Sequence, residues 1–280
     1  MGNARQQLSF AALDDLFGVP QDRRKEVAAW FQVGVGSENL GPIIELVLHR
    51  ENYGFDLPFI QAHVTGPAID ALLSLIYKKP DSRLPTGTNL EPKTIEVCGG
   101  FAVNGRQAEA LRIAFWKRAE RAAGMAGFSG KISLGISGAI QEMVDNVLQH
   151  SERVATGIVG YRWVPGEFEF VVADAGIGVL NSLQKSREHC ALSDHGRAMR
   201  LAFDGHSRFG LGQGRGCGFH QLFLSLAELH GTLRFRSGDH AIEIEGNGPG
   251  AATANTMQRS FFQGFMMSAI CRQKKSHTPP

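Results

Sequence analysis

The sequence predicts an α/β protein: a two-layer sandwich, with helices on one face of a mixed β-sheet, preceded by a small, mainly helical N-terminal region. Two observations predict this fold class. Before residue 80, apolar residues recur at helical spacing, whereas after residue 92 segments of strand composition alternate with helical ones. Elements in this order are typical of helices packed on a single sheet.

The segment "KKPDSRLPTGTNLEP", 78–92, divides the chain because it holds three prolines and few apolar residues. We therefore expect an N-terminal helical region at 1–80, a linker or loop at 81–92, a sheet-and-helix domain at 93–270 and a disordered tail at 271–280.

Helices are expected in the N-terminal region at 22–35, 41–52 and 66–77, where Pro67 suits the first turn of a helix. After the linker, 93–99 has strand composition. Helices are then expected at 106–124, ended by Gly124, and over 130–151.

The rest of the domain is expected to be mainly strands. Two segments flank Pro165-Gly166, 156–163 and 167–174, and predict a hairpin. A helix follows at 217–231. A second hairpin is predicted over 231–246, with its turn near Ser237-Gly238-Asp239, and a final strand at 261–270.

Composition narrows the function classes. The 280 residues are 43% apolar and 20% charged, with a formal net charge of +2, which gives no bulk electrostatic case for nucleic acid or a membrane surface. The four cysteines are far apart, which argues against a zinc site or a disulfide framework and fits a reducing compartment. No secretory h-region or membrane-length apolar run is present, so we expect a cytoplasmic protein.

The first chemical motif is "QEMVDNVLQHS", 141–151. Glu142, Asn146 and Gln149 share one helical face that borders an apolar stripe. A carboxylate and a carboxamide there could bind a hard cation, or the glutamate could act as a general base. The alternative is a partly exposed polar edge of the helix, and the helix alone leaves both open.

The second motif is "VVADAGIGV", 171–179. An apolar strand runs into Asp174, which could accept a hydrogen bond from an amino group, and Gly176 and Gly178 follow it. A strand that simply ends in an Asp-containing turn is the alternative.

The third motif is "GQGRGCGFHQL", 212–222. Gly214, Gly216 and Gly218 precede a predicted helix, where backbone N–H groups can bind phosphate. The Walker A pattern and a Rossmann fingerprint are both absent. The alternative is a flexible glycine-rich loop.

Taken in order, E-x-x-x-N, D-x-G-x-G and G-x-G-x-G resemble the boxes of the GHKL ATPase superfamily, which groups gyrase, heat-shock chaperones, histidine kinases and mismatch-repair ATPases. The resemblance covers about residues 93–270 and is nearest to stand-alone ATP-binding proteins of the histidine-kinase and anti-sigma-factor branches. It implies ATP and Mg²⁺ as ligands, with Glu142 catalytic and Asn146 binding the magnesium ion. It also implies that Asp174 recognises the adenine amino group.

The same resemblance assigns the glycines and three arginines. Gly176 and Gly178 would let the chain pass the nucleotide, and the last glycine box would wrap the phosphates. The stretch from about 179 to 213 would be a lid over ATP. Arginines suited to phosphate contact are Arg197, Arg208 and Arg215. His150 would be a structural histidine beside the site, and Gly264 would sit where relatives often have Pro-Gly-Thr before the last strand.

Three functions follow from this reading. The first is phosphotransfer to a protein partner, on serine or threonine as in anti-sigma-type kinases. The second is a slow ATPase that acts as a conformational switch. The third is an ATP-sensing or purely interacting module without catalysis. Glu142 favours chemistry, and the N-terminal region would recognise a partner. No nucleic acid or membrane partner is expected, and a homodimer is compatible with the sequence.

Overall fold

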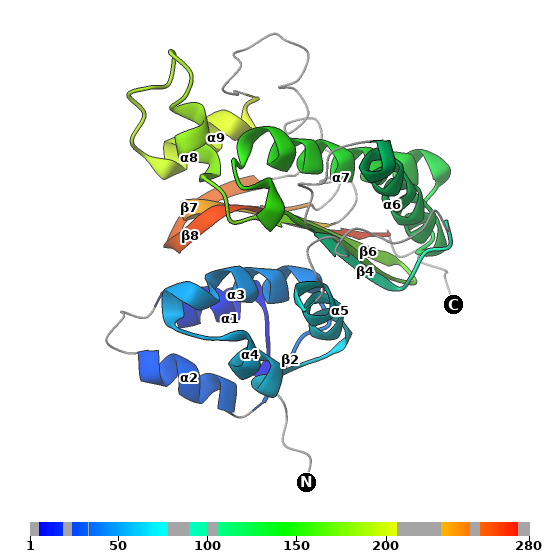
Figure 1. Cartoon of the computed structure of the whole chain (residues 1–280), viewed down its shortest axis with the longest axis horizontal. Helices are drawn as coiled ribbons and strands as arrows, with labels where there is room; N and C mark the ends of the chain where they lie inside the picture. The colour runs from blue at the N-terminus through cyan, green and yellow to red at the C-terminus, as the bar shows by residue number, and fades with distance from the viewer. Residues whose placement is uncertain are drawn as a thin grey trace.

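The computed structural model of the chain describes residues 6–18, 24–32, 34–77, 90–99, 106–205, 231–246 and 253–273. These residues form three layers, with a five-stranded sheet in the middle (Figure 1). Long helices cover one face of the sheet, and the helices of the N-terminal region lie against the other. The α/β class predicted from the sequence is confirmed at this level.

The described part of the N-terminal region contains five α-helices around a small parallel sheet in the order β1-β2-β3. Its elements are β1 Gln6–Gln7, α1 Phe10–Phe17, α2 Arg24–Gln32, β2 Val35–Gly36, α3 Leu40–Tyr53, α4 Leu57–His63, β3 Val64–Thr65 and α5 Pro67–Ile76.

Local chemistry sets where several of these helices begin. The Ser9 hydroxyl accepts from the Ala12 N–H at 3.2 Å, and the Asp56 carboxylate accepts from the Phe59 N–H at 2.8 Å. Both side chains satisfy donors that have no partner in the first turn of a helix. Pro67 begins α5, as the sequence predicted.

The remaining elements build the large sheet and its helical cover. They are β4 Ile95–Gly99, α6 Arg106–Met125, α7 Gly130–His150, β5 Ile158–Val164, β6 Glu167–Asp174, α8 Gly178–Leu183, α9 His195–Phe203, β7 Thr232–Glu245 and β8 Thr253–Arg272. The β5–β6 hairpin around Pro165-Gly166 is confirmed, as are the helices at α6 and α7.

The sheet differs from the expectation in two ways. Its order is β4-β5-β6-β8-β7, and every neighbouring pair is antiparallel, so the predicted mixed sheet is wrong. Helices also cover both of its faces. Strands β5 and β6 are buried on both sides over most of their length, which fits a sheet that lies between two layers.

The predicted hairpin over 231–246 is also wrong. These residues form one long strand, β7, and the pairing register with β8 shifts between Ser237 and His240. Gly238, which we expected in the turn, has φ +59° and takes the special backbone position of a β-bulge. Strand β8 likewise continues through Arg272, into the segment expected to be disordered.

Two apolar cores hold the layers together. The first lies between α6, α7 and the sheet, and includes Phe115, Ile140, Met143, Phe168 and Phe235, all 2% exposed or less. The second joins the N-terminal helices to the opposite face of the sheet. Val171, Ala173, Phe262 and Met266 of the sheet belong to that second core. The N-terminal region is thus part of the sheet's packing. Among the described residues, no helix is long and apolar enough to cross a membrane.

Candidate functional site

The first motif lies on α7, whose buried side packs on the sheet. Glu142 and Asn146 are both half-buried, at the edge of the apolar stripe. Burial raises the pKa of the Glu142 carboxyl above its usual range, and the nearby Asp145 adds to the effect. A glutamate with a raised pKa beside a core is a better proton acceptor near neutral pH than an exposed one.

Asn146 carries the clearest sign of a missing partner. Its Nδ2 atom is buried and has no hydrogen-bond partner among the residues that the structure describes. Buried amides are nearly always hydrogen-bonded, because an unpaired amide loses its hydrogen bonds to water and gains no protein hydrogen bond in return. A side-chain amide in this condition is a natural position for a ligand.

The second motif places Asp174 at the last residue of β6. The side chain is almost completely buried, and its Oδ1 accepts a hydrogen bond from the Gly176 N–H at 2.6 Å. Burial raises the pKa of the Asp174 carboxyl from 3.8 to about 7, and the Gly176 hydrogen bond opposes this only in part. Among the described residues, no arginine or lysine is paired with this carboxylate. Asp174 is therefore available to a neutral donor such as an amino group.

The end of α7 and the loop after Asp174 are held directly against each other. The Ile177 N–H donates to the Ser151 carbonyl at 3.0 Å, and the Ala175 N–H donates to the Thr156 hydroxyl at 3.0 Å. His150 lies in the same place, with its Nδ1 3.3 Å from the Ser182 hydroxyl of α8. The first two motifs, about 30 residues apart in sequence, thus contact each other at the end of α7, and His150 lies at this contact.

Gly176 and Gly178 are explained by contacts within the protein. A Cβ on Gly176 would lie 2.1 Å from the Ser151 carbonyl oxygen, so no side chain fits there. Gly178 has φ +74°, a conformation that favours glycine, and a Cβ there would lie 2.9 Å from the Ser237 hydroxyl. Both glycines let the loop pack tightly between α7 and the sheet.

Strands β7 and β8 supply three contacts to this loop, and two of the residues involved, Ser237 and Gln263, were not indicated by the motifs. The Ser237 hydroxyl accepts from the Val179 N–H at 3.0 Å, and the Gln263 amide donates to the Gly176 carbonyl at 2.5 Å. Gly264, with φ +91°, is so close to the loop that a Cβ would lie 2.1 Å from the Asp174 carbonyl oxygen. The sequence signal for these residues was the glycine beside each polar residue, at Ser237-Gly238 and Gln263-Gly264.

Arg197 lies on α9, which packs on α8 and β7, and its side chain is exposed. Within the described residues, Arg197 makes no hydrogen bond or ion pair with Asp174 or Asn146. The other predicted phosphate ligands, Arg208, Gly214, Arg215, Gly216 and Gly218, lie outside the described residues, as does the helix expected at 217–231. Within the described residues, no group of three or more His, Cys, Asp and Glu side chains is arranged to hold a metal ion.

The residues present fit a magnesium nucleotide in two respects. Asp174 offers a buried acceptor of the kind that binds an amino group. The Asn146 side chain offers an amide oxygen, the ligand type that Mg²⁺ prefers, and an unpaired Nδ2 donor that a phosphate oxygen could accept. The chain matches no known protein-family model and has no significant match among curated proteins.

Proposed function

We propose that this protein binds ATP with Mg²⁺ in the site formed by α7 and the loop after β6, and transfers a phosphoryl group to a protein partner. The observation that carries the proposal is the pairing of two motifs at one place. Helix α7, which carries the unpartnered Asn146 Nδ2, ends against the loop that follows the buried Asp174.

The proposal assigns one role each to Asp174, Asn146 and Glu142. Asp174 accepts a hydrogen bond from the adenine amino group, and Asn146 holds the magnesium ion through its amide oxygen. The metal ion, when bound, neutralises charge on the phosphates. Glu142 orients and deprotonates the acceptor, for which its raised pKa suits it. Serine or threonine of a partner protein is the acceptor class that fits a carboxylate base.

The glycine-rich segment around Gly214, Gly216 and Gly218 completes the proposal. Its backbone N–H groups would bind the phosphates, with Arg197, Arg208 and Arg215 as further contacts. A slow ATPase switch uses the same residues and differs only in the acceptor, which is then water.

The proposal is tested with two variants that separate binding from chemistry. Asp174→Asn removes the negative charge of the adenine acceptor and should weaken ATP binding about tenfold or more, because a charge-assisted hydrogen bond is lost. Glu142→Ala should bind ATP normally but lose turnover by about a hundredfold or more, the usual contribution of a general base.

Equilibrium titration with ATP and a phosphate-release or phosphotransfer assay provide the readouts. Unchanged affinity in Asp174→Asn would sink the adenine assignment. Turnover that persists in Glu142→Ala would show that the base is a different residue.

A further inference from the structure

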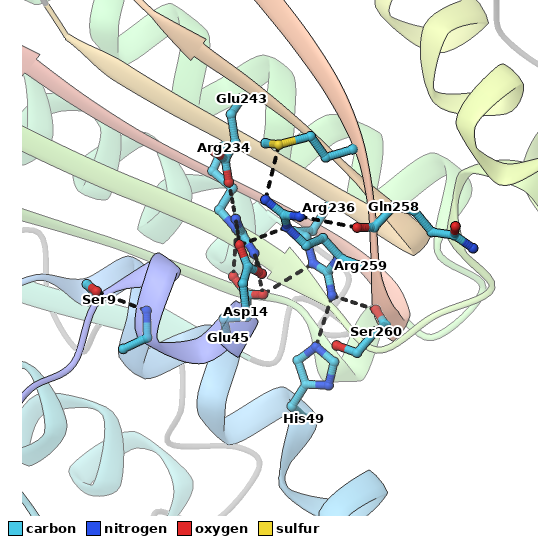
Figure 2. A network of polar contacts seen from close by, with 12 residues as sticks. Ser9, Asp14, Glu45, His49, Arg234, Arg236, Glu243, Gln258, Arg259 and Ser260 are labelled. Carbon is cyan, nitrogen blue, oxygen red and sulfur yellow. Dashed lines mark hydrogen bonds and ion pairs between the residues drawn. The ribbon is translucent and has the colours of Figure 1, made fainter. Parts of the chain in front are cut away.

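The bulge in β7 lies between the candidate site and the N-terminal region. Side chains along a strand alternate between faces, so Leu233 and Phe235 enter the core under the helices, while Arg234 and Arg236 point to the N-terminal side. Figure 2 shows both arginines extending from β7 toward Glu45, Asp14 and His49 of the N-terminal helices.

On the helix side, Ser237 holds the candidate site. Its hydroxyl is buried, donates to the Gly264 carbonyl at 2.7 Å and accepts from the Val179 N–H at 3.0 Å. One hydroxyl thus bonds the start of α8 and the β8 residue that packs on Asp174. Ser237 therefore helps to fix the loop that carries the adenine acceptor.

The same bulge receives α9. A Cβ on Gly238 would lie 2.1 Å from the His195 ring, and a Cβ on Gly196 would lie 2.7 Å from the His240 ring. Each glycine therefore lets a histidine ring of the other element lie against its backbone, so β7 and α9 are in close contact at the bulge. Because the contacts are close-packed, a change in the backbone conformation of the bulge would shift both the loop after Asp174 and helix α9, which carries Arg197.

On the N-terminal side, Arg236 is fully buried and only partly satisfied. Its Nε lies 3.2 Å from a Glu45 oxygen, and its Nη2 donates to the Ser260 carbonyl at 2.8 Å. The same Nη2 lies 3.2 Å from His49 Nε2, and burial lowers the pKa of His49 to about 3, so the ring is neutral. Nη1 of Arg236 has no hydrogen-bond partner among the described residues.

A buried cation is costly unless it is paired, so the few groups that pair with it fix its position. When those groups move, the cation is expected to move with them. Glu45 and His49 both belong to α3, so the N-terminal region sets the position of Arg236. Arg236 and Ser237 are consecutive residues of β7, so a shift of Arg236 is passed directly to Ser237.

We propose that the β7 bulge couples the N-terminal region to the nucleotide loop, with Ser237 as the positioning residue on one face and Arg236 as the anchor on the other. This inference rests on the proposed function for its ligand, ATP. It means that a partner that shifts α3 changes the affinity of the site for nucleotide, and that nucleotide changes the affinity for that partner by the same factor.

Amide hydrogen exchange on the full chain tests the coupling without any ligand. Ser237→Ala should raise exchange at the Val179 amide about fivefold to tenfold, the effect of losing one hydrogen bond. The Ile177 amide, which bonds Ser151 instead, is the internal control and should change much less.

Arg236→Met tests whether the N-terminal side of the β7 bulge contributes to the coupling. It removes the incompletely paired cation while Glu45 keeps its contacts with Arg234. We expect Val179 exchange and the ATP dissociation constant each to rise about fivefold, although the Ser237 hydroxyl is untouched. If Arg236→Met fails to fold, Arg236→Lys keeps the charge but not the three contacts, and should give the same shift.

Arg162→Met is the matched control. Arg162 is also a buried arginine at this interface, bonded to Glu169 of β6 and to Asn39 of the N-terminal region, but it lies on β5. It should leave Val179 unchanged.

Three outcomes decide the matter. If Arg162→Met raised Val179 exchange as much as Arg236→Met does, general loosening of the interface would explain the result and the coupling would be overturned. Unchanged Val179 exchange in Arg236→Met would overturn it as well. Wild-type protein that does not bind ATP, but whose Val179 amide responds to Arg236→Met, would refute the proposed function and leave the coupling standing.

Discussion

Asp174 and Asn146 are polar side chains held at the edge of a largely apolar interior, and both are destabilising unless a ligand uses them. The Asp174 carboxylate is buried with one backbone donor, and the Asn146 Nδ2 has no partner in the described part of the chain. Proteins usually satisfy such groups, so both side chains are candidates for a functional role.

Asp174→Asn should raise the stability of the ligand-free protein at high pH. The folded-state pKa of about 7 exceeds the ordinary value of 3.8, so ionisation favours the unfolded state. This destabilisation is absent below pH 4, grows between pH 4 and 7 and is complete above 7, at about 1.4 kcal/mol per pKa unit.

Denaturant unfolding of both proteins at pH 5 and pH 8 measures this effect. The stabilisation by Asp174→Asn should be larger at pH 8 by a few kcal/mol. Equal stabilisation at the two pH values would mean that Asp174 is ionised in the folded protein across this range.

At the scale of elements, the site depends on how tightly α7, the loop and β8 pack. The sequence identified α7, the β5–β6 hairpin and Asp174 at its end, because apolar periodicity and a Pro-Gly turn are local signals. It gave the wrong structure for β7, since a Ser-Gly-Asp turn signal and a Gly-containing bulge have the same composition. Only the pairing of β7 with β8 over its full length distinguishes them.

Glycines at two places in this unit should respond in opposite directions to alanine. Gly135 is exposed on α7, and a Cβ there meets no atom within 4 Å, so Gly135→Ala should stabilise the protein by about 0.5–1 kcal/mol. Gly176→Ala should destabilise it and weaken ATP binding, because the new Cβ would collide with the Ser151 carbonyl.

Thermal unfolding and ATP titration of the two variants provide the comparison. Gly135→Ala controls for the loss of backbone freedom in the unfolded chain. If Gly176→Ala were as stable and as active as wild type, the tight contact between α7 and the loop would not exist in solution.

At the scale of the whole molecule, the N-terminal region and the sheet share a core and two buried ionic clusters. Arg234 is nearly fully buried and bonds Asp14, Glu45 and Glu243. At the other end of the interface, the buried Glu169 carboxylate accepts from the Gly41 N–H at 2.8 Å, in the first turn of α3. The positive end of the helix dipole at this N-terminus stabilises the negatively charged carboxylate.

Glu169→Ala should therefore weaken the whole fold, by about 3–5 kcal/mol, the usual cost of breaking a buried pair from one side. The helix start and Arg162 would both lose a buried partner. Glu91→Ala is the control, since its ion pair with Arg121 is exposed and should be worth less than about 1 kcal/mol.

Calorimetry of both variants measures these differences, and the N-terminal helices and the sheet should unfold in one transition. A Glu169→Ala protein in which the N-terminal region unfolds separately, at lower temperature, would show that the second core does not join the two regions cooperatively.

The sequence could not reveal this arrangement. Helices α2, α3 and α5 were expected from their periodicity, whereas α1 and α4 were missed. The place of these helices on the second face of the sheet depends on contacts across more than 120 residues, as between Gly41 and Glu169. The three two-residue strands carry no period at all. Local patterns predicted most of the long elements and the motifs of the candidate site, whereas the long-range charge clusters emerged only from the fold.

Calorimetric titration of ATP, with and without Mg²⁺, on wild-type protein and Asn146→Ala tests the central claim most directly. The variant should fold normally, because the Asn146 Nδ2 makes no hydrogen bond to another described residue. We predict magnesium-dependent binding by wild type and its loss in Asn146→Ala. Absence of binding to wild type, or the same magnesium-dependent binding by both proteins, would contradict a nucleotide site at α7.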